Sequence, residues 1–503
     1  MKKNYFLIAV IAIALSTVAT RAFAQDPFAP RIVPAPVECS LSASNYVTLK
    51  KVVVATNDEA AYNWVKDHFA LWYKELAPTV TKVPYSGTSA HEEGYSISIN
   101  KKEVRIEAAN IKGARYAMQS LRQVTMPGRG TLKTENYIVP TGYVNDYPKT
   151  DFRGIHICWY PETQEWEIER MIRLAGYYKL NYVVLEAWGT YESKVAPWLF
   201  WNNPSMTKER IKKFVALSKD LGITLIPAYN IFSHASASSI ESGKHATLDL
   251  HPEYAPLFEP ISGWNWCLSN PESKKVIKSV IAEMLEDFDN PKYFHIGCNE
   301  ALEPSCPVCK KQSYSKLFVS HVTDINKMLT KKGVRAMMWH DMLLKKGDER
   351  WADHTANGTE ATAKAAEALP KNIIICDGYF GKSKKKEYKS YSYFTSLGYD
   401  LLACPWNNAV ATTAQAKAAR AVGAMGMLGT AWNKYTGSNL ANSILAVSSV
   451  TWNPKVRTAR YGYNFHTHFY KTRLREVGMD ANLTEYHQFG TTYLQVPYAT
   501  PIN

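Results

Sequence analysis

The sequence lacks the short motifs that identify several common enzyme classes. Its 503 residues contain no Gly-rich phosphate loop after a strand, no Gly-x-Ser-x-Gly turn for a serine nucleophile and no His-Glu-x-x-His zinc motif. These absences leave a nucleotide-binding, serine-hydrolase or metalloprotease function without support. We therefore predict neither a cofactor nor a resident metal ion.

Cysteine is scarce, with eight residues in the whole chain. That number is too small for a disulfide scaffold in a protein of this length. Cys306 and Cys309 form a single Cys-x-x-Cys pair, whereas a zinc ribbon needs a second pair. We interpret them as a local disulfide or two free thiols rather than as metal ligands. Five further cysteines lie in apolar, strand-like contexts and are predicted to be buried thiols: Cys158, Cys267, Cys298, Cys376 and Cys404.

Long apolar runs are absent after the first 24 residues. A membrane-spanning helix needs on the order of 20 apolar residues, and no later segment provides them, so we predict no membrane insertion. Met1–Ala24 has the features of a secretory signal peptide: a basic start at Lys2 and Lys3, an apolar middle, and small residues before a cleavage site after Ala24. The sequence therefore predicts an exported protein, periplasmic or secreted.

Negative charge is in the minority, with 45 acidic residues against 59 Lys and Arg and a net charge of +14. An excess of this size can indicate nucleic acid or an acidic polymer as a partner. However, the basic residues are scattered, and the densest run, Lys382 with Lys384–Lys386, is typical of a solvated loop. Export also argues against nucleic acid, so we predict none. An anionic glycan stays open as an alternative, and the sequence does not indicate the oligomeric state.

Residues 25–145 have the pattern of a small α+β domain. Val47–Ala55 is predicted to be a strand, and Gly94–Ile99 with Val104–Ala108 to be a β-hairpin. The apolar spacing of Ala60–Leu76 and Gly113–Val124 predicts two amphipathic helices. Catalytic residue types are not concentrated here, which indicates a supporting role.

From residue 146 to 455 strands and helices alternate. The predicted strands are Gly154–Trp159, Tyr182–Ala187, Thr224–Tyr229, Tyr293–Gly297, Arg335–Trp339, Ile373–Cys376, Leu401–Pro405 and Met425–Ala431. The predicted helices are Trp166–Tyr178, Lys208–Leu221, Ser273–Asp287, Ser315–Lys332 and Ala411–Ala421. About eight such units favour an α/β fold, a (β/α)8 TIM barrel preceded by the small domain, over a doubly wound open sheet. Residues 456–503 are predicted to be a tail, helical at first and then irregular.

In such a barrel the residues at the C-terminal strand ends line one mouth. Here they are rich in Trp, with some carboxylates, amides and His: His156, Trp159, Glu186, Trp188, Asn230, His234, Asn299, Glu300, Trp339, Asp341, Asp377, Tyr379, Trp406, Asn407, Trp432 and Asn433. A single Trp is more often a core residue. Several at strand ends favour a carbohydrate pocket, because flat aromatic faces pack against apolar sugar faces.

The stretch Tyr293–Glu300 carries the strongest chemical signal, because an apolar strand ends there in the pair Asn299-Glu300. Glycoside hydrolysis needs an acid, and burial would raise the pKa of Glu300 toward neutrality. An amide is no nucleophile, but Asn299 can orient a substrate acetamido group whose oxygen attacks the anomeric carbon. A two-carboxylate mechanism would need an acid after the seventh strand, where Cys404–Asn408 has none. The simplest alternative is that the pair caps a helix or faces water.

The chain resembles glycoside hydrolase family 20, the β-N-acetylhexosaminidases, and especially its divergent bacterial branches. Arg31–Pro36, Glu93–Ile99 and the region to Gln123 resemble the family's N-terminal domain. The barrel segments that carry the resemblance are Asp151–Gly154, Leu221–Pro227 with Ser233-His234, His295–Glu300, Trp339 with Asp341, and Trp432.

The resemblance implies substrate-assisted, retaining removal of β-linked N-acetylhexosamine from a glycan, with Glu300 as acid/base and Asn299 as the orienting group. With the strand-end positions, it gives these substrate-binding residues: Arg153, Glu186, His234, Trp339, Asp341, Asp377, Tyr379, Trp406 and Trp432. The family usually has Asp at position 299, and an Asn there is similar to the endo-β-N-acetylglucosaminidases. Asn433-Lys434 and Glu186–Trp188 also depart from the family pattern. The alternatives are a glycan-binding protein that has lost its chemistry and a glycosidase for sulfated or otherwise anionic glycans.

Overall fold

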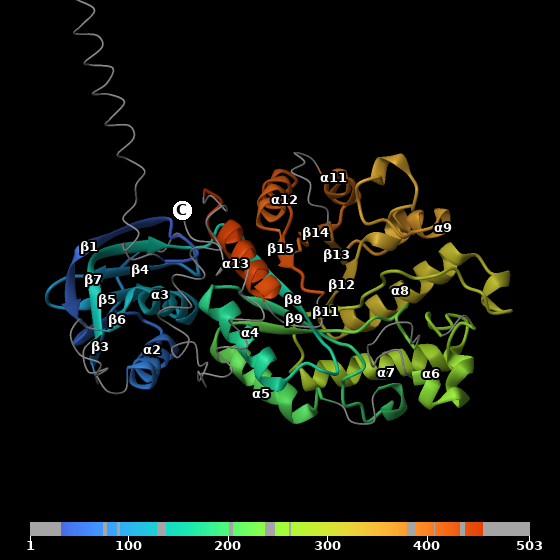
Figure 1. Cartoon of the computed structure of the whole chain (residues 1–503), viewed down its shortest axis with the longest axis horizontal. Coiled ribbons are helices and arrows are strands. Elements are labelled where there is room, and N and C mark those ends of the chain that lie inside the picture. Colours follow the sequence, from blue (N-terminus) through green and yellow to red (C-terminus); the bar gives the residue numbers. More distant parts are fainter. Residues whose placement is uncertain are drawn as a thin grey trace, which may run out of the picture. The chain divides into compact units, whose positions relative to one another are not determined.

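Over the residues that it describes, the structure, a computed structural model, forms two compact units, residue 32 with 36–146 and residues 33–35 with 147–455 (Figure 1). It describes residues 32–73, 78–87, 91–127, 137–200, 205–236, 247–260, 263–379, 388–406, 408–432 and 438–455. The predicted signal peptide, the lysine run near 384 and the predicted tail lie outside these ranges and stay predictions. Within them, no helix has both the length and the apolar character that crossing a membrane requires.

In its described residues, the first unit is a seven-stranded mixed sheet with two helices. Its elements are β1 (Glu38–Thr48), β2 (Lys51–Ala55), α2 (Glu59–Trp72), β3 (Thr79–Val83), β4 (Tyr95–Ile99), β5 (Val104–Ala108), α3 (Ile111–Val124), β6 (Met126–Pro127) and β7 (Tyr137–Asp146). The strand order is β1-β7-β4-β5-β2-β3, with β6 beside β7. The predicted hairpin is confirmed as antiparallel β4 and β5. The single strand predicted over Val47–Ala55 is wrong, because the chain turns at Leu49-Lys50 between β1 and β2.

The second unit is a closed barrel of eight parallel strands, which confirms the predicted (β/α)8 architecture. The strands are β8 (Phe152–Trp159), β9 (Tyr182–Ala187), β10 (Thr224–Ala228), β11 (Tyr293–His295), β12 (Arg335–Trp339), β13 (Ile374–Asp377), β14 (Asp400–Ala403) and β15 (Gly426–Gly429). They pair in chain order, and β15 pairs with β8 to close the barrel. The sequence located all eight because each is a short apolar run that ends at a turn.

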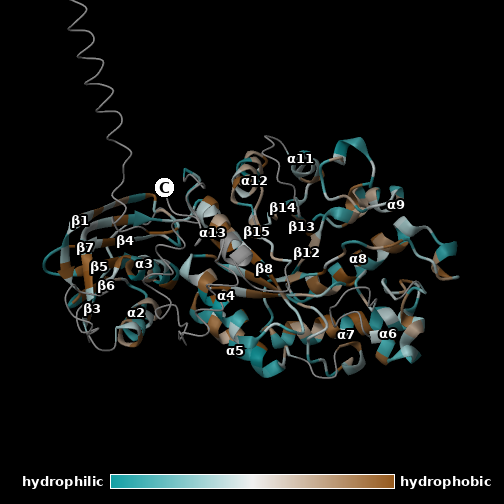
Figure 2. Cartoon of the chain, viewed as in Figure 1, coloured by the Kyte–Doolittle hydropathy of each residue, from teal (hydrophilic) through white to brown (hydrophobic). Residues whose placement is uncertain are grey.

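Helices follow the strands around the outside of the barrel. They are α4 (Glu165–Tyr177), α5 (Lys208–Asp220), α6 (Thr247–Leu250), α7 (Pro271–Asp287), α8 (Tyr314–Lys331), α9 (Glu360–Ala363), α10 (Ala365–Ala368), α11 (Lys389–Ser396), α12 (Ala409–Ala421) and α13 (Ser438–Trp452). Short 3-10 turns are η1 (Pro197–Leu199), η3 (Pro252–Leu257), η4 (Cys309–Lys311), η5 (Asp341–Leu343) and η6 (Glu349–Trp351). In Figure 2 helices such as α5 and α7 carry both brown and teal residues, as expected where one face packs inward and the other meets solvent.

Helix α13 was not predicted from the sequence. Its residues from Ser443 to Trp452 are all buried, small polar ones included, so this stretch has no solvent-exposed polar face to mark an amphipathic period. A helix that is buried on every side cannot be recognised by periodicity. Its contacts with β8 and β15 place it over the point where the barrel closes.

Alternation along β8 decides which of its side chains enter the barrel. Phe152 belongs to the inner core, whereas Ile155, Ile157 and Trp159 belong to the outer core between strands and helices. Successive strand residues point to opposite faces, so Arg153 shares the outer face with Trp159. The alternation of inward and outward side chains along β8 therefore determines which predicted site residues of this strand can reach the barrel interior.

Candidate active site

A cavity of about 300 Å³ lies at the C-terminal ends of the barrel strands. Its volume is at the lower end of the range of small-molecule pockets, which suits one monosaccharide unit. The cavity is lined by Tyr160, Trp188, His234, Asn299, Glu300, Trp339, His340, Asp341, Thr355, Asn357, Gly378, Trp406 and Trp432. Seven of the eleven residues predicted to be catalytic or substrate-binding are therefore brought together.

The loop that carries Asn299 and Glu300 has an unusual backbone. Strand β11 ends at His295, two residues earlier than predicted, and the chain then takes positive φ at Gly297 (68°), Cys298 (69°) and Glu300 (52°). Non-glycine residues in this region are strained by about 1–2 kcal/mol each, and such conformations persist where the surroundings hold them. Gly297 is needed, because a Cβ there would lie 2.6 Å from Cγ of Asn230. This backbone conformation places Asn299 and Glu300 at the cavity.

Hydrogen bonds to neighbouring segments fix the backbone of this loop. The N–H of Trp339 donates to the carbonyl of Gly297 at 2.9 Å. Asp341 Oδ2 accepts the N–H of Glu300 at 2.8 Å, and the indole N–H of Trp264 donates to the carbonyl of Glu300 at 2.7 Å. Asn299 and Glu300 therefore do not cap a helix, since α8 begins only at Tyr314, with Ser313 as its N-cap.

The hydrogen-bond network determines the orientation of the Asn299 amide. Asn230 Oδ1 accepts the backbone N–H groups of Phe232, Ser233 and Cys298, so the remaining atom of that amide is the donor Nδ2. Asn230 Nδ2 donates to Asn299 Oδ1 at 2.8 Å. Asn299 therefore directs its NH₂ group toward Nε2 of His234, 3.3 Å away. A carbonyl oxygen has two lone pairs, so Asn299 Oδ1 can accept one further N–H from a ligand.

Glu300 stands next to Asn299, with its Oε2 3.1 Å from Nε2 of His234. Its side chain is 54% exposed, whereas the sequence predicted a carboxyl desolvated by the end of an apolar strand. That prediction is wrong, because the chain leaves the strand at His295 and turns Glu300 out into the open cavity. Desolvation of Glu300 therefore has to come from a bound ligand that covers it.

Asp341 is the buried carboxyl of the cavity, and burial raises its pKa above the ordinary value for Asp. Its Oδ2 accepts the N–H of Glu300 and the side-chain amide of Asn357, at 2.8 and 3.0 Å. Its Oδ1 has no hydrogen-bond partner among the residues that the structure describes. Since a buried acceptor is rarely left unpaired, this oxygen is a candidate contact for a ligand hydroxyl or amide N–H.

Aromatic rings form the walls of the cavity. The rings of Trp339 and Trp432 lie 5.3 Å apart, and those of Tyr160 and Trp188 lie 5.2 Å apart. The Tyr160 hydroxyl donates to the carbonyl of Trp432 at 3.0 Å, which joins the first and last strand ends. These flat apolar faces beside carboxyl and amide groups are suited to a sugar ring.

Four predicted site residues do not line the cavity. Arg153 is fully buried on the outer side of β8, where its guanidinium donates to the carbonyls of Lys179 (3.1 Å) and Thr150 (2.8 Å). It also lies over the ring of Trp452. The predicted sugar contact of Arg153 is wrong, because alternation along the strand turns it away from the barrel interior. Trp159, on the same face, packs against Phe214 of α5.

The other three are Glu186, Asp377 and Tyr379. Glu186 is buried, with Oε2 2.9 Å from Nε2 of His156. Asp377 is fully buried, with Oδ1 3.5 Å from Nε2 of His340. Tyr379 packs in the outer core against Tyr388. Their placement as substrate contacts is corrected, because a position at a strand end does not by itself put a side chain at the surface of the mouth.

Sequence reasoning missed five lining residues: Tyr160, His340, Thr355, Asn357 and Gly378. Tyr160 continues the inward parity of Phe152 one step past the predicted strand end, so alternation could have found it. Thr355 and Asn357 lie in an irregular segment after η6, which carries no periodic signal. Asn407 and Asn433, also predicted at the mouth, lie outside the described residues. None of the described lining residues is Lys or Arg, which gives no support to an anionic ligand.

Comparison with protein families finds two matches in order along the chain. "Glycosyl hydrolase family 20, domain 2" matches residues 29–147, and "Glycosyl hydrolase family 20, catalytic domain" matches residues 176–454. The second match alone spans more than half of the chain.

Among curated proteins, a lacto-N-biosidase of Bifidobacterium bifidum is 27% identical over 277 residues, which is 50% of this chain and 22% of that protein. A beta-hexosaminidase of Porphyromonas gingivalis is 25% identical over 292 residues, 50% of this chain and 36% of that protein. The chain thus spans well under two thirds of the length of these relatives.

Solved structures share the fold. An exo-β-N-acetylglucosaminidase of Vibrio harveyi superposes with a TM-score of 0.64 at 16% identity, covering 92% of this chain and 78% of the other. A β-N-acetylhexosaminidase of Bacteroides fragilis gives a TM-score of 0.61 at 18% identity, covering 88% and 95%. At these identities the likeness concerns architecture.

Proposed function

Because the chain belongs to glycosyl hydrolase family 20, we propose that it removes β-linked N-acetylhexosamine from glycans by substrate-assisted hydrolysis with retention of configuration. The observation that carries this proposal is the pair Asn299-Glu300, held side by side at one end of the cavity. The curated relatives, a lacto-N-biosidase and beta-hexosaminidases among them, support a hexosamine-containing substrate.

In the proposed first step Glu300 protonates the glycosidic oxygen while the acetamido oxygen of the substrate attacks the anomeric carbon. The C–O bond to the leaving group breaks, and an oxazolinium ion forms within the sugar. Asn299 Oδ1, already fixed by Asn230, accepts the acetamido N–H and aligns the group for attack. Alignment of a reacting pair can supply several kcal/mol of the barrier reduction.

In the proposed second step the Glu300 carboxylate takes a proton from water, and the water oxygen attacks the anomeric carbon. The oxazolinium ring opens, so two inversions give net retention. His234 lies within hydrogen-bonding distance of both Glu300 and Asn299, so we assign it the positioning of this pair. Asp341 holds the Glu300 backbone and offers Oδ1 to the substrate.

A matched pair of substrates tests the proposal against a mechanism with an enzymatic nucleophile, for which Asp341 is the candidate. We expect an aryl β-N-acetylglucosaminide to be hydrolysed and the corresponding aryl β-glucoside, which lacks the acetamido group, to react at least about 10³-fold more slowly in kcat/KM. The measurement is steady-state release of the phenol, with proton NMR of the first-formed sugar anomer to establish retention. Comparable rates on the two substrates would contradict substrate assistance.

Arg153 provides a second test, because the proposal gives it no sugar contact. Replacing Arg153 by Met removes donors from buried carbonyls, so we expect the free energy of unfolding to fall by about 3 kcal/mol while KM stays within twofold. Urea unfolding and substrate kinetics measure both. Arg173→Met is the matched control, since Arg173 makes a partly exposed ion pair with Glu169 and should matter little. A raised KM with unchanged stability would restore the sugar contact that the resemblance implied.

A further inference from the structure

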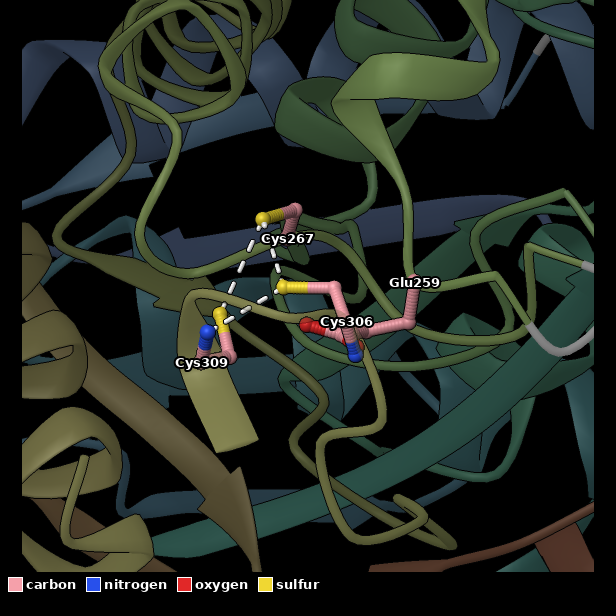
Figure 3. Close-up of side chains that lie close together, drawn as sticks. All are labelled: Glu259, Cys267, Cys306 and Cys309. Carbon is pink, nitrogen blue, oxygen red and sulfur yellow. Dashed lines mark hydrogen bonds between the residues drawn. The ribbon is translucent and has the colours of Figure 1, made fainter. Parts of the chain in front are cut away.

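Outside the cavity, three cysteines and one glutamate meet in the interior of the second unit (Figure 3). One possible ligand atom from each of Glu259, Cys267, Cys306 and Cys309 lies within 4.8 Å of those from the other three, and all four residues are buried. The sulfur of Cys267 is 3.8 Å from that of Cys306 and 3.7 Å from that of Cys309. The close-up shows the three sulfur atoms turned toward one another with the Glu259 carboxylate beside them.

The sulfur separations match a shared metal ion better than a disulfide. Thiolates bound to tetrahedral zinc at about 2.3 Å are about 3.8 Å from one another, the separation observed here. A disulfide would bring two sulfurs to about 2.0 Å and leave the third apart. Cys267 is instead equally close to both partners, so no pair is selected, and all three thiols are free.

The environment of Glu259 gives an independent indication. Glu259 is only 4% exposed. Its Oε2 accepts the backbone N–H groups of Ser305 and Cys306 at 2.8 and 2.6 Å. Its Oε1 is buried and has no hydrogen-bond partner within the described ranges. A buried carboxylate oxygen without a partner is unfavourable, and a cation held by the adjacent sulfurs would satisfy it.

We propose that Glu259, Cys267, Cys306 and Cys309 bind one Zn²⁺ ion through three thiolates and one carboxylate oxygen. Thiolate-rich, four-coordinate sites select zinc among the common divalent ions, and a site closed by four protein ligands is structural. The N–H of Cys309 donates to Sγ of Cys306 at 3.2 Å, which stabilises negative charge on that sulfur. Local sequence patterns do not indicate this set of ligands, because Glu259 and Cys267 come from a different loop than the Cys-x-x-Cys pair.

The proposed ion would join the two loops that hold the active-site acid. Glu259 and Cys267 flank the segment whose Trp264 donates to the Glu300 carbonyl and whose Asn265 exchanges two hydrogen bonds with the backbone of Leu302. Cys306 and Cys309 follow Glu300 on the second loop. The ion would therefore restrain the position of Glu300 without taking part in catalysis.

Elemental analysis of the purified full chain, prepared without chelators and then dialysed, tests the proposal. We expect about one zinc per chain in the wild type and its loss in Cys306→Ser. Cys39→Ser, which alters an exposed cysteine of the first unit, is the matched control and should keep the metal. The wild-type stoichiometry does not depend on whether any variant folds. A metal-free wild type that takes up no added Zn²⁺ would overturn the proposal.

Cobalt replacement and intact mass separate the metal from a disulfide. With Co²⁺ in place of zinc we expect thiolate-to-cobalt charge-transfer absorption, weakened in Cys309→Ser and retained in Glu259→Cys, which supplies a fourth thiolate. Denaturing mass spectrometry should show all cysteines reduced. A protein mass two hydrogens below that of the fully reduced chain, with the bond mapped to two of Cys267, Cys306 and Cys309, would show a disulfide there and contradict the metal site. None of these readouts requires glycosidase activity.

Discussion

Replacing Glu300 by Gln is expected to lower kcat/KM for a natural disaccharide by about 10²–10⁴-fold. The variant keeps the shape of the side chain and loses the proton that the leaving oxygen needs. Glu300 lines the cavity and lies in a loop, outside any helix or strand, so we expect its replacement to leave the fold unaffected. Hydrolysis of a β-linked N-acetylglucosamine disaccharide, followed by product release, measures the effect.

The leaving group distinguishes loss of the acid from general damage. An aryl glycoside with an acidic phenol needs little protonation, so its loss in Glu300→Gln should be smaller than that of the disaccharide. Glu303→Gln, an exposed residue three positions along the same loop, is the matched control and should retain wild-type rates. A Glu300→Gln variant that still cleaves the disaccharide at more than a tenth of the wild-type rate would remove Glu300 from the role of acid.

Replacing Asn299 by Ala is expected to lower kcat by about 10²–10³-fold on an aryl β-N-acetylglucosaminide, the magnitude found for the loss of one preorganised polar group. The reason is geometric, because Asn299 Oδ1 is fixed by Asn230 and its amide faces His234. Without the Asn299 amide, no group in this position accepts the acetamido N–H of the substrate and aligns its oxygen for attack. KM should change less than kcat, since the aromatic walls remain.

Asn299→Asp is the informative companion, because it introduces the residue that the resemblance gives at this position. Asn230 Nδ2 can donate to a carboxylate as it does to the amide oxygen, so we expect the Asp variant to be at least as active as the wild type. Both variants are measured with the same aryl substrate. If Asn299→Ala kept wild-type kcat, the acetamido group would have to be aligned by another residue.

The sequence was sufficient to predict the strands of the barrel, but only some of the residues that line the cavity at its C-terminal end. Each barrel strand is an apolar run that ends at a turn, and the rule that active sites lie at C-terminal strand ends gathered Asn299, Glu300 and His234 correctly. Tyr379 was misplaced because a strand-end position does not specify the face on which a side chain stands. Arg153 was assigned from the family resemblance, but it lies near the start of β8, on the outer face of the strand. Alternation would have corrected Arg153, since Phe152 beside it faces inward.

Other features could not be reached by local patterns. Asn357 enters the cavity from an irregular segment, and its partner Asp341 is known only once the chain is folded. The backbone turn at Gly297–Glu300, which exposes the predicted buried acid, depends on the packing of Asn230 from the preceding strand end. The meeting of Glu259 and Cys267 with the Cys-x-x-Cys pair is likewise a property of two loops that pack together.

Closure of the barrel through β15 and β8 has a consequence for the order in which the protein can mature. A nascent chain contains Glu300 and the residues that hold it before Trp406 and Trp432 have been synthesised, so these two aromatic residues of the cavity are added last. Until α13 emerges, the carbonyl of Trp452 that accepts the Lys149 N–H is missing, and β8 lacks its neighbour β15. A chain cut short before residue 426 would therefore expose two unpaired strand edges, a template for aggregation.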